Sequence, residues 1–194
     1  TLFRSVDILS NKVMNNLMVI SMMKSLVTTS CCTLLPFLWR NEMHYSPLHI
    51  GIALSLFVLA GGIGSMVSRS IEVSWGTKRL LYFSMIATLP MIILFHLTYQ
   101  NHPIISLITF IVIGFTTMLA QPVTMVMAQK TLPQYKSIVA GFINGFAWGV
   151  VAIALSVIGI SAQHFGITNV LIALSIFPAL SSYIIKYLPR SEEH

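Results

Sequence analysis

The sequence contains very little charge. Asp, Glu, Lys and Arg make up 8% of its 194 residues, whereas hydrophobic residues make up 56% and the mean hydropathy is +0.84. Because a soluble domain carries about 25% charged residues, this composition excludes an ordinary soluble domain. It predicts an all-α integral membrane protein instead.

Acidic residues and histidines are absent from the interior of every long apolar stretch. The five acids, which we place between or beyond those stretches, are Asp7, Glu42, Glu72, Glu192 and Glu193. An intramembrane hydrolase would need a serine beside a buried histidine, or paired aspartates. The GxSxG, HExxH and P-loop patterns are missing too, so we expect no enzyme, no metal site and no cofactor.

Cysteine is limited to Cys31 and Cys32, and adjacent cysteines make a poor disulfide pair.

A secretory signal is also missing, because the polar and charged Thr1–Ser5 segment is not followed by an apolar core. We therefore expect residues 1–13 to be a non-native or linker start outside the fold.

Long apolar stretches are abundant. A membrane helix needs about 20 mainly apolar residues, and six stretches qualify, separated by turn-forming segments such as SRSIEVSWGTK, YQNHP and AQHFG. They cover residues 14–39, 47–68, 79–98, 103–128, 137–161 and 167–188 and predict one six-helix bundle over residues 14–190.

Lysine and arginine are unevenly divided between the two ends of these spans. One end holds Arg4, Lys12, Arg69, Lys78, Arg79, Lys130, Lys136, Lys186 and Arg190, and the other holds Arg40 alone. The positive-inside rule therefore predicts both chain ends in the cytoplasm. Topology then explains the net charge of +6, and no nucleic-acid partner is expected.

The six spans divide into two triplets of similar character. The first and fourth spans contain polar residues, the second and fifth are rich in glycine, and the third and sixth are plainer. Transporters often contain two three-helix repeats of inverted topology, and we expect that arrangement here.

Glycines recur on one face of two spans. Gly141, Gly145 and Gly149 are spaced by four in the fifth span, and in the AGGIGS segment of the second span Gly61 and Ser65, or Ala60 and Gly64, are also four apart. Such faces let two helix backbones approach closely, so we predict tight packing faces on both spans. The same faces could serve as sliding surfaces in a rocking transporter, and their spacing does not separate the two roles.

Polar residues in the fourth and fifth spans are candidates for a substrate path. Asn144 and Trp148, four residues apart, either line a cavity or bond to other helices. Gln121 precedes Pro122, which either kinks the fourth span or marks a cavity.

Lys24 is the charge inside a span, on a polar stripe that continues through Thr28 and Cys32. A charge at a helix centre costs ~2.5–3.5 kcal/mol on insertion scales, so Lys24 either snorkels to the headgroups or lines a cavity. Since the spans hold no acid, its expected partner is Gln121, Asn144, a backbone carbonyl, an anionic substrate or an acid outside this sequence.

Residues 55–81 (SLFVLAGGIGSMVSRSIEVSWGTKRLL), residues 128–153 (AQKTLPQYKSIVAGFINGFAWGVVAI) and the lysine-bearing first span resemble a known family. They are similar to the C-terminal half of major facilitator superfamily transporters, closest to the fosmidomycin-resistance type of drug efflux protein. The resemblance implies that the six spans are the seventh to twelfth of a twelve-helix transporter. Its first, second, fourth and fifth spans would border the central path, and the third and sixth would face lipid.

The cytoplasmic loop after the second span departs from the family's pattern, G-x-L-x-D-R-x-G-R-R. Gly76, Lys78 and Arg79 match, but Val73 replaces the acid and Glu72 is displaced by one. The resemblance therefore does not carry over the conformational latch that this acid provides.

Two further departures concern charge. Relatives tend to have Glu where Lys130 stands and Arg where Lys24 stands. An ammonium lacks the planar fork that grips a phosphonate at two points, so the substrate class is not carried over.

The resemblance implies a secondary active antiporter for proton-coupled efflux of a small molecule or drug, of an antibiotic-resistance type, in a bacterial inner membrane. Its partners would be a missing N-terminal six-helix half, the lipid bilayer, the substrate and protons. The alternative is a self-contained six-span protein with an assembly or interaction role and no transport. Six further spans encoded upstream in frame would favour the transporter, and an in-frame stop before a start near Met14 would favour the alternative.

Overall fold

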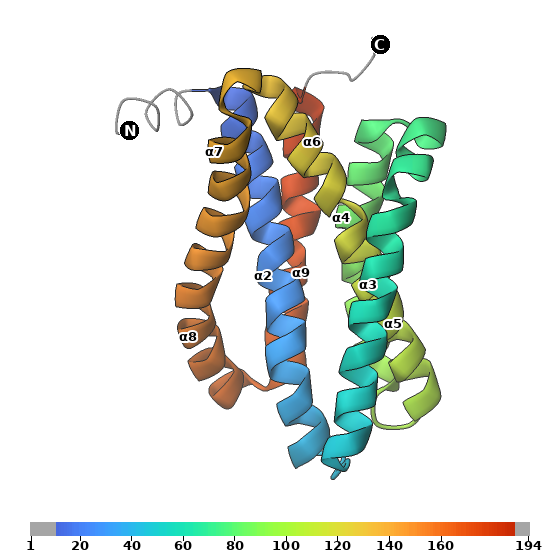
Figure 1. Cartoon of the computed structure of the whole chain (residues 1–194). Helices are drawn as coiled ribbons and strands as arrows, with labels where there is room; N and C mark the ends of the chain where they lie inside the picture. The colour runs from blue at the N-terminus through green and yellow to red at the C-terminus, as the bar shows by residue number, and fades with distance from the viewer. Residues whose placement is uncertain (1–10, 189–194) are drawn as a thin grey trace.

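The computed structural model describes residues 11–188, and these form an all-helical bundle (Figure 1). Six helical segments are long and apolar enough to cross a membrane, as the sequence predicts. They are Lys12–Asn41, Pro47–Trp75, Thr77–Thr98, Pro103–Thr131, Pro133–Phe165 and Ile167–Tyr187. Most of the expected linker start lies outside the described residues, as do Asp7, Arg190, Glu192 and Glu193, but Lys12 and Val13 already belong to the first helix.

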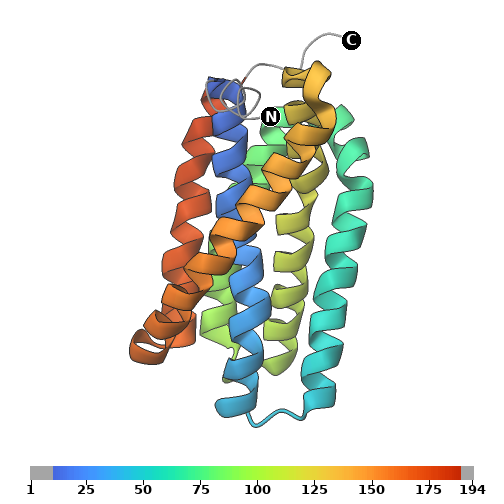
Figure 2. The same ribbon diagram turned by 60° about the vertical axis from the view of Figure 1, so that its left-hand side comes forward.

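Helix α2 (Lys12–Asn41) occupies the middle of the bundle. The side chain of Asn11 caps its start by accepting hydrogen bonds from the backbone N–H groups of Val13 and Met14, at 3.0 and 3.2 Å. Helix α8 (Ala147–Phe165) runs obliquely across α2, as Figure 2 shows. Because neighbours pack around it, α2 is the most buried of the six spans.

The second and third helices of each triplet are joined by a single glycine. Gly76 separates α3 (Pro47–Trp75) from α4 (Thr77–Thr98) with φ +83° and ψ 149°, and Gly166 separates α8 from α9 (Ile167–Ser181) with φ +85° and ψ 145°. These are backbone conformations that glycine adopts most readily. The expected loop over residues 69–75 is therefore wrong: no residue before Gly76 breaks the helix, and α3 continues to it.

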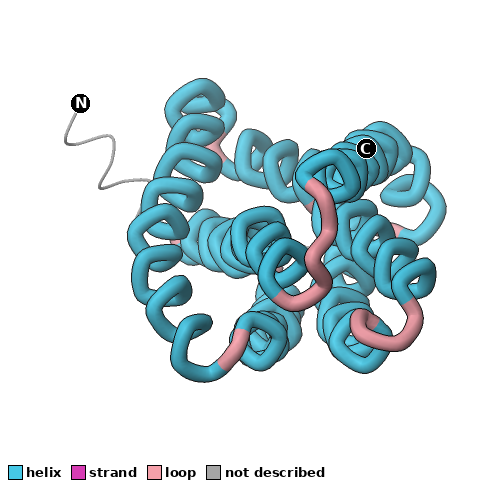
Figure 3. The backbone as a smooth tube through the Cα atoms, turned by 90° about the horizontal axis from the view of Figure 1, so that it is seen from below, coloured by secondary structure: helices cyan, strands magenta, loops and turns pink. Residues whose placement is uncertain are grey.

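Helix pairing repeats between the two triplets. α3 packs against α5 (Pro103–Leu119) as α8 packs against α2, and α4 packs against α5 as α9 packs against α2. α4 and α9 pack against each other. This exchange symmetry and the matching glycine turns are those of two inverted three-helix repeats. Figure 3 shows the short connections at one end of the bundle.

Two apolar clusters fill the interior toward opposite ends. α2 contributes Met14, Leu17 and Ile20 to one cluster, and Val27 and Cys31 to the other. Lys24 lies between these two groups on the same helix, so the change from one cluster to the other coincides with a charged side chain.

Candidate functional site

Lys24 is the only charged side chain that is buried among residues 11–188, with 3% of its surface exposed. Its Nζ donates a hydrogen bond to Oε1 of Gln121. Burying an ammonium without any partner would cost far more than burying it with one. The structure thus selects Gln121 from the partners that the sequence left open, and the ammonium points into the bundle.

Gln121 opens α6 (Gln121–Thr131), directly after the interruption at Ala120 that separates α6 from α5. Its Nε2 donates to Oδ1 of Asn144 at 2.8 Å. Asn144 belongs to η2 (Phe142–Phe146), a π-helical turn between α7 (Lys136–Gly141) and α8. Two amides therefore connect three separate elements at the depth of Lys24.

The second bond fixes the direction of the first. Because the Gln121 amide gives its N–H to Asn144, its oxygen is the end that faces Lys24. An ammonium has donors and no acceptor, so this orientation is the one that suits a charged lysine. The three side chains form one chain of hydrogen bonds, which we call the Lys24–Gln121–Asn144 network.

Two serines of α3 form hydrogen bonds at the interruption beside Gln121, and these bonds were not predicted from the sequence. Pro122 lacks the N–H that would bond the Met118 carbonyl in a continuous helix. Ser65 Oγ donates to that carbonyl at 3.3 Å, and Ser68 Oγ donates to the Leu119 carbonyl at 2.8 Å. Their spacing of three, beside the glycines of α3, was the available signal.

The other predicted path residues take different positions. Thr28 is buried, and its Oγ1 donates back to the Lys24 carbonyl at 3.0 Å. Cys32 is half-buried one turn further along α2. Trp148 is 49% exposed and has no hydrogen bond to the network. Of this pair, Asn144 therefore bonds to another helix, and the role of Trp148 stays a prediction.

The two glycine faces also differ. A Cβ on Gly64 would lie 2.6 Å from the Phe115 carbonyl oxygen, and one on Gly61 would lie 2.7 Å from Met118 Cγ. Gly141, Gly145 and Gly149 have no such neighbour within 4 Å and line an open groove of about 490 Å³. Within residues 11–188, close packing is therefore seen on α3 and not on the face that carries the other three glycines, where it stays a prediction.

The sequence profile of the Major Facilitator Superfamily matches residues 17–194. The chain belongs to this superfamily. YfnC of Bacillus subtilis (strain 168), described as an uncharacterized MFS-type transporter, is 25% identical over 157 residues, which cover 81% of the chain and 37% of that relative. The chain thus spans less than half of that relative's length. No solved structure matches the chain.

Membership of the Major Facilitator Superfamily decides two expectations. It identifies the chain as an integral membrane protein, in agreement with the six apolar helices. It also points to a protein of a transporter family and away from an enzyme.

The residues of the loop motif lie at the end of α3 and the start of α4. Glu72 lies in the last turn of α3, so its placement in a loop is wrong. Its carboxylate accepts hydrogen bonds from Arg69 and from Thr77 Oγ1, both at 2.8 Å. Lys78 Nζ donates to the Lys186 carbonyl at 3.2 Å. The displaced acid thus joins α3 to α4.

A second polar cluster, which the sequence analysis missed, lies at the opposite end of the bundle. Tyr99 donates its hydroxyl to Glu42 Oε2 at 3.1 Å, and Gln100 Nε2 donates to the Tyr99 hydroxyl at 2.8 Å. Burial first, and then the charge of Glu42, raise the pKa of Tyr99 above its usual value. The phenol therefore stays a neutral donor that links the ends of α2 and α4.

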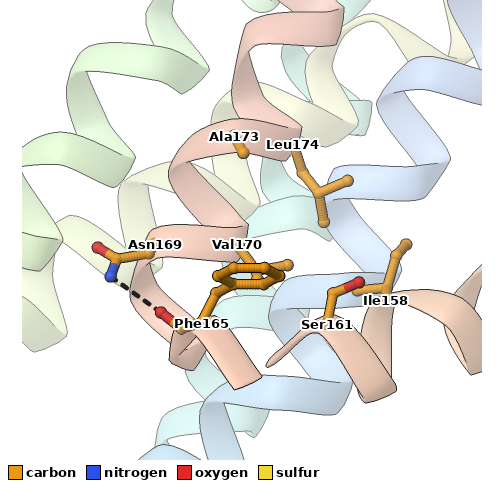
Figure 4. A pocket seen from close by; sticks show the side chains of 7 residues that line it. All are labelled: Ile158, Ser161, Phe165, Asn169, Val170, Ala173 and Leu174. Atoms are coloured by element: carbon orange, nitrogen blue, oxygen red, sulfur yellow. Dashed lines mark hydrogen bonds between the residues drawn. The ribbon is translucent and has the colours of Figure 1, made fainter. Parts of the chain in front are cut away.

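A hollow of about 360 Å³ lies between α8 and α9 (Figure 4). Its lining is mainly apolar, from side chains such as Ile158, Val170 and Leu174. The Asn169 amide in it donates to the Phe165 carbonyl at 2.9 Å. No charged side chain lines it, so the Lys24–Gln121–Asn144 network remains the candidate site.

Proposed function

We propose that the chain is the C-terminal half of a secondary active transporter that exports a small molecule in exchange for protons. It would work by alternating access in a bacterial inner membrane, with both chain ends in the cytoplasm. The observation that carries the proposal is the buried Lys24 ammonium of the first triplet, which is bonded through two neutral amides to elements of the second triplet. Ionisable groups inside membrane spans usually mark a substrate or ion pathway.

The exposure of α3 and α8 supports a second half. These are the least buried of the six spans, and the groove along Gly141, Gly145 and Gly149 lies open. The relative YfnC extends well beyond the matched region. An N-terminal six-helix half would pack against these two helices and complete a path.

The proton carrier belongs to that second half in this proposal. Glu42 and Glu72, the acids among the described residues, lie at helix ends and accept hydrogen bonds there. Proton relays in transporters commonly use carboxylates within the spans. Lys24 would then provide the fixed positive charge of the path, and an acid of the other half would titrate.

Substitution of Lys24 by alanine in the intact transporter tests this function. We expect Lys24→Ala to abolish efflux, measured as the accumulation in cells of a compound that the parent transporter exports. Membrane expression should remain normal, because alanine removes a charge that is costly to bury.

Lys12→Ala is the matched control, since Lys12 is an exposed lysine on the same helix and should leave efflux unchanged. Efflux by Lys24→Ala at the level of the parent would remove Lys24 from the mechanism.

A further inference from the structure

We propose that Asn144 is a positioning residue that closes the bundle over Lys24. By holding the Gln121 amide, it keeps the ammonium covered, and movement of α7 and η2 uncovers it. The inference rests on the proposed function only in that uncovering would be a step of the transport cycle.

The two amides stand where their own helices are interrupted. Gln121 follows the break between α5 and α6 at Ala120, and Asn144 is the central residue of the π-helical turn. Helix interruptions of these kinds are places where a helix bends or changes register. The 2.8 Å bond between Nε2 and Oδ1 therefore joins two potential hinges.

The two interruptions are supported unequally. Ser65 and Ser68 of α3 bond the carbonyls beside the first one. Gly141 and Gly145, beside and within the second, have no atom within 4 Å of where a Cβ would stand. Glycine weakens a helix interior, so α7 and η2 form the side that is easier to move.

Loss of the Asn144 oxygen would disturb Lys24 through Gln121. The Gln121 amide would lose the acceptor that fixes its nitrogen and could rotate, bringing an N–H toward the ammonium in place of the oxygen. Two donors facing each other repel. Both the cover and the partner of Lys24 therefore depend on Asn144, although Asn144 has no hydrogen bond to Lys24.

Thiol labelling in the intact, membrane-embedded transporter tests the cover without requiring transport. Thr28→Cys places a reporter one turn from Lys24, at a site that is 4% exposed, after Cys31 and Cys32 are replaced by alanine. We expect Asn144→Leu to increase the rate of modification by a small methanethiosulfonate about tenfold, equivalent to about 1.4 kcal/mol.

Asn144→Asp distinguishes loss of the hydrogen bond from a mere change of side chain at this position, because a carboxylate still accepts a hydrogen bond from Gln121. We expect it to keep the labelling rate near that of the parent. Asn169→Leu controls for loss of an asparagine elsewhere in the bundle and should have no effect, since Asn169 bonds only a local carbonyl in the described structure.

Gln121→Leu removes the same hydrogen bond from the other side and should also increase labelling, which gives a second variant if Asn144→Leu does not reach the membrane. Unchanged labelling in Asn144→Leu and Gln121→Leu, or an equal increase in Asn144→Asp or Asn169→Leu, would overturn the proposal. An increase confined to Asn144→Leu and Gln121→Leu would support it even if Lys24→Ala transported normally, so the two proposals fail separately.

Discussion

Helices α3 and α8 hold equivalent places in the two triplets, yet they are packed in opposite ways. Both are glycine-rich, both end at a glycine with positive φ, and they lie at opposite edges of the bundle (Figure 1). α3 is pressed against α5, with Gly61 and Gly64 facing α5 atoms. The glycines of α7, η2 and α8 face open space.

The same spacing of small residues therefore has two physical uses. On α3 it permits contact between backbones, and serines of the same helix then bond α5 carbonyls across the interface. Near Asn144 the glycines lower the stability of the helix, and no neighbouring element packs against them. The interface between α3 and α5 is therefore closely packed and fixed. The face that carries Gly141, Gly145 and Gly149 has the properties of a moving or partner-binding element.

The largest expected effect is at the fixed interface. Gly114 of α5 faces α3, and a Cβ there would lie 2.5 Å from the Phe57 carbonyl oxygen and 2.9 Å from its ring. A backbone oxygen cannot move aside, so we expect Gly114→Ala to destabilise the protein by about 1–3 kcal/mol. The midpoint of thermal unfolding of the purified intact transporter measures this loss.

Gly51→Ala supplies the matched substitution on α3, since a Cβ there has no neighbour within 4 Å. If both variants unfolded at the parent's temperature, α3 and α5 would not be packed as closely as the structure indicates.

The next effect concerns the break between α5 and α6. Ser68→Ala would leave the Leu119 carbonyl without its 2.8 Å partner, and we expect a loss of about 1 kcal/mol in the free energy of unfolding. Ser74→Ala is the control, because Ser74 Oγ is exposed and bonds the Ser70 carbonyl of its own helix. An equal effect of both substitutions would mean that the serine contact does not stabilise the break.

Much of this architecture follows from sequence because it depends on composition and period. Six apolar stretches predict the spans, and the absence of acids around Lys24 restricts its partner to a short set that includes Gln121. Gly76 and Gly166 end helices for a local reason, the positive φ that glycine tolerates.

What sequence does not predict depends on neighbours in space. The π-helical turn at Phe142–Phe146 was not predicted, because Gly145 is the only residue in it that disfavours a helix. The role of Ser68 requires knowing that α3 lies against the α5 break. The two glycine faces look alike in sequence, because the spacing shows that a neighbouring helix could approach each face closely but not whether one does.

The smallest expected change in stability is the sharpest test of the comparison. Gly145→Ala adds a Cβ with no neighbour within 4 Å, and alanine favours a helix interior by ~1 kcal/mol over glycine. We therefore expect unfolding at or slightly above the parent's temperature. We also expect transport to fall, because the new methyl group would enter the groove where the second half is proposed to pack.

Gly159→Ala, further along α8 and equally free of neighbours, should leave transport intact. Normal transport by Gly145→Ala would instead mean that this face meets lipid, and the contrast between α3 and α8 would then reflect packing within one half alone.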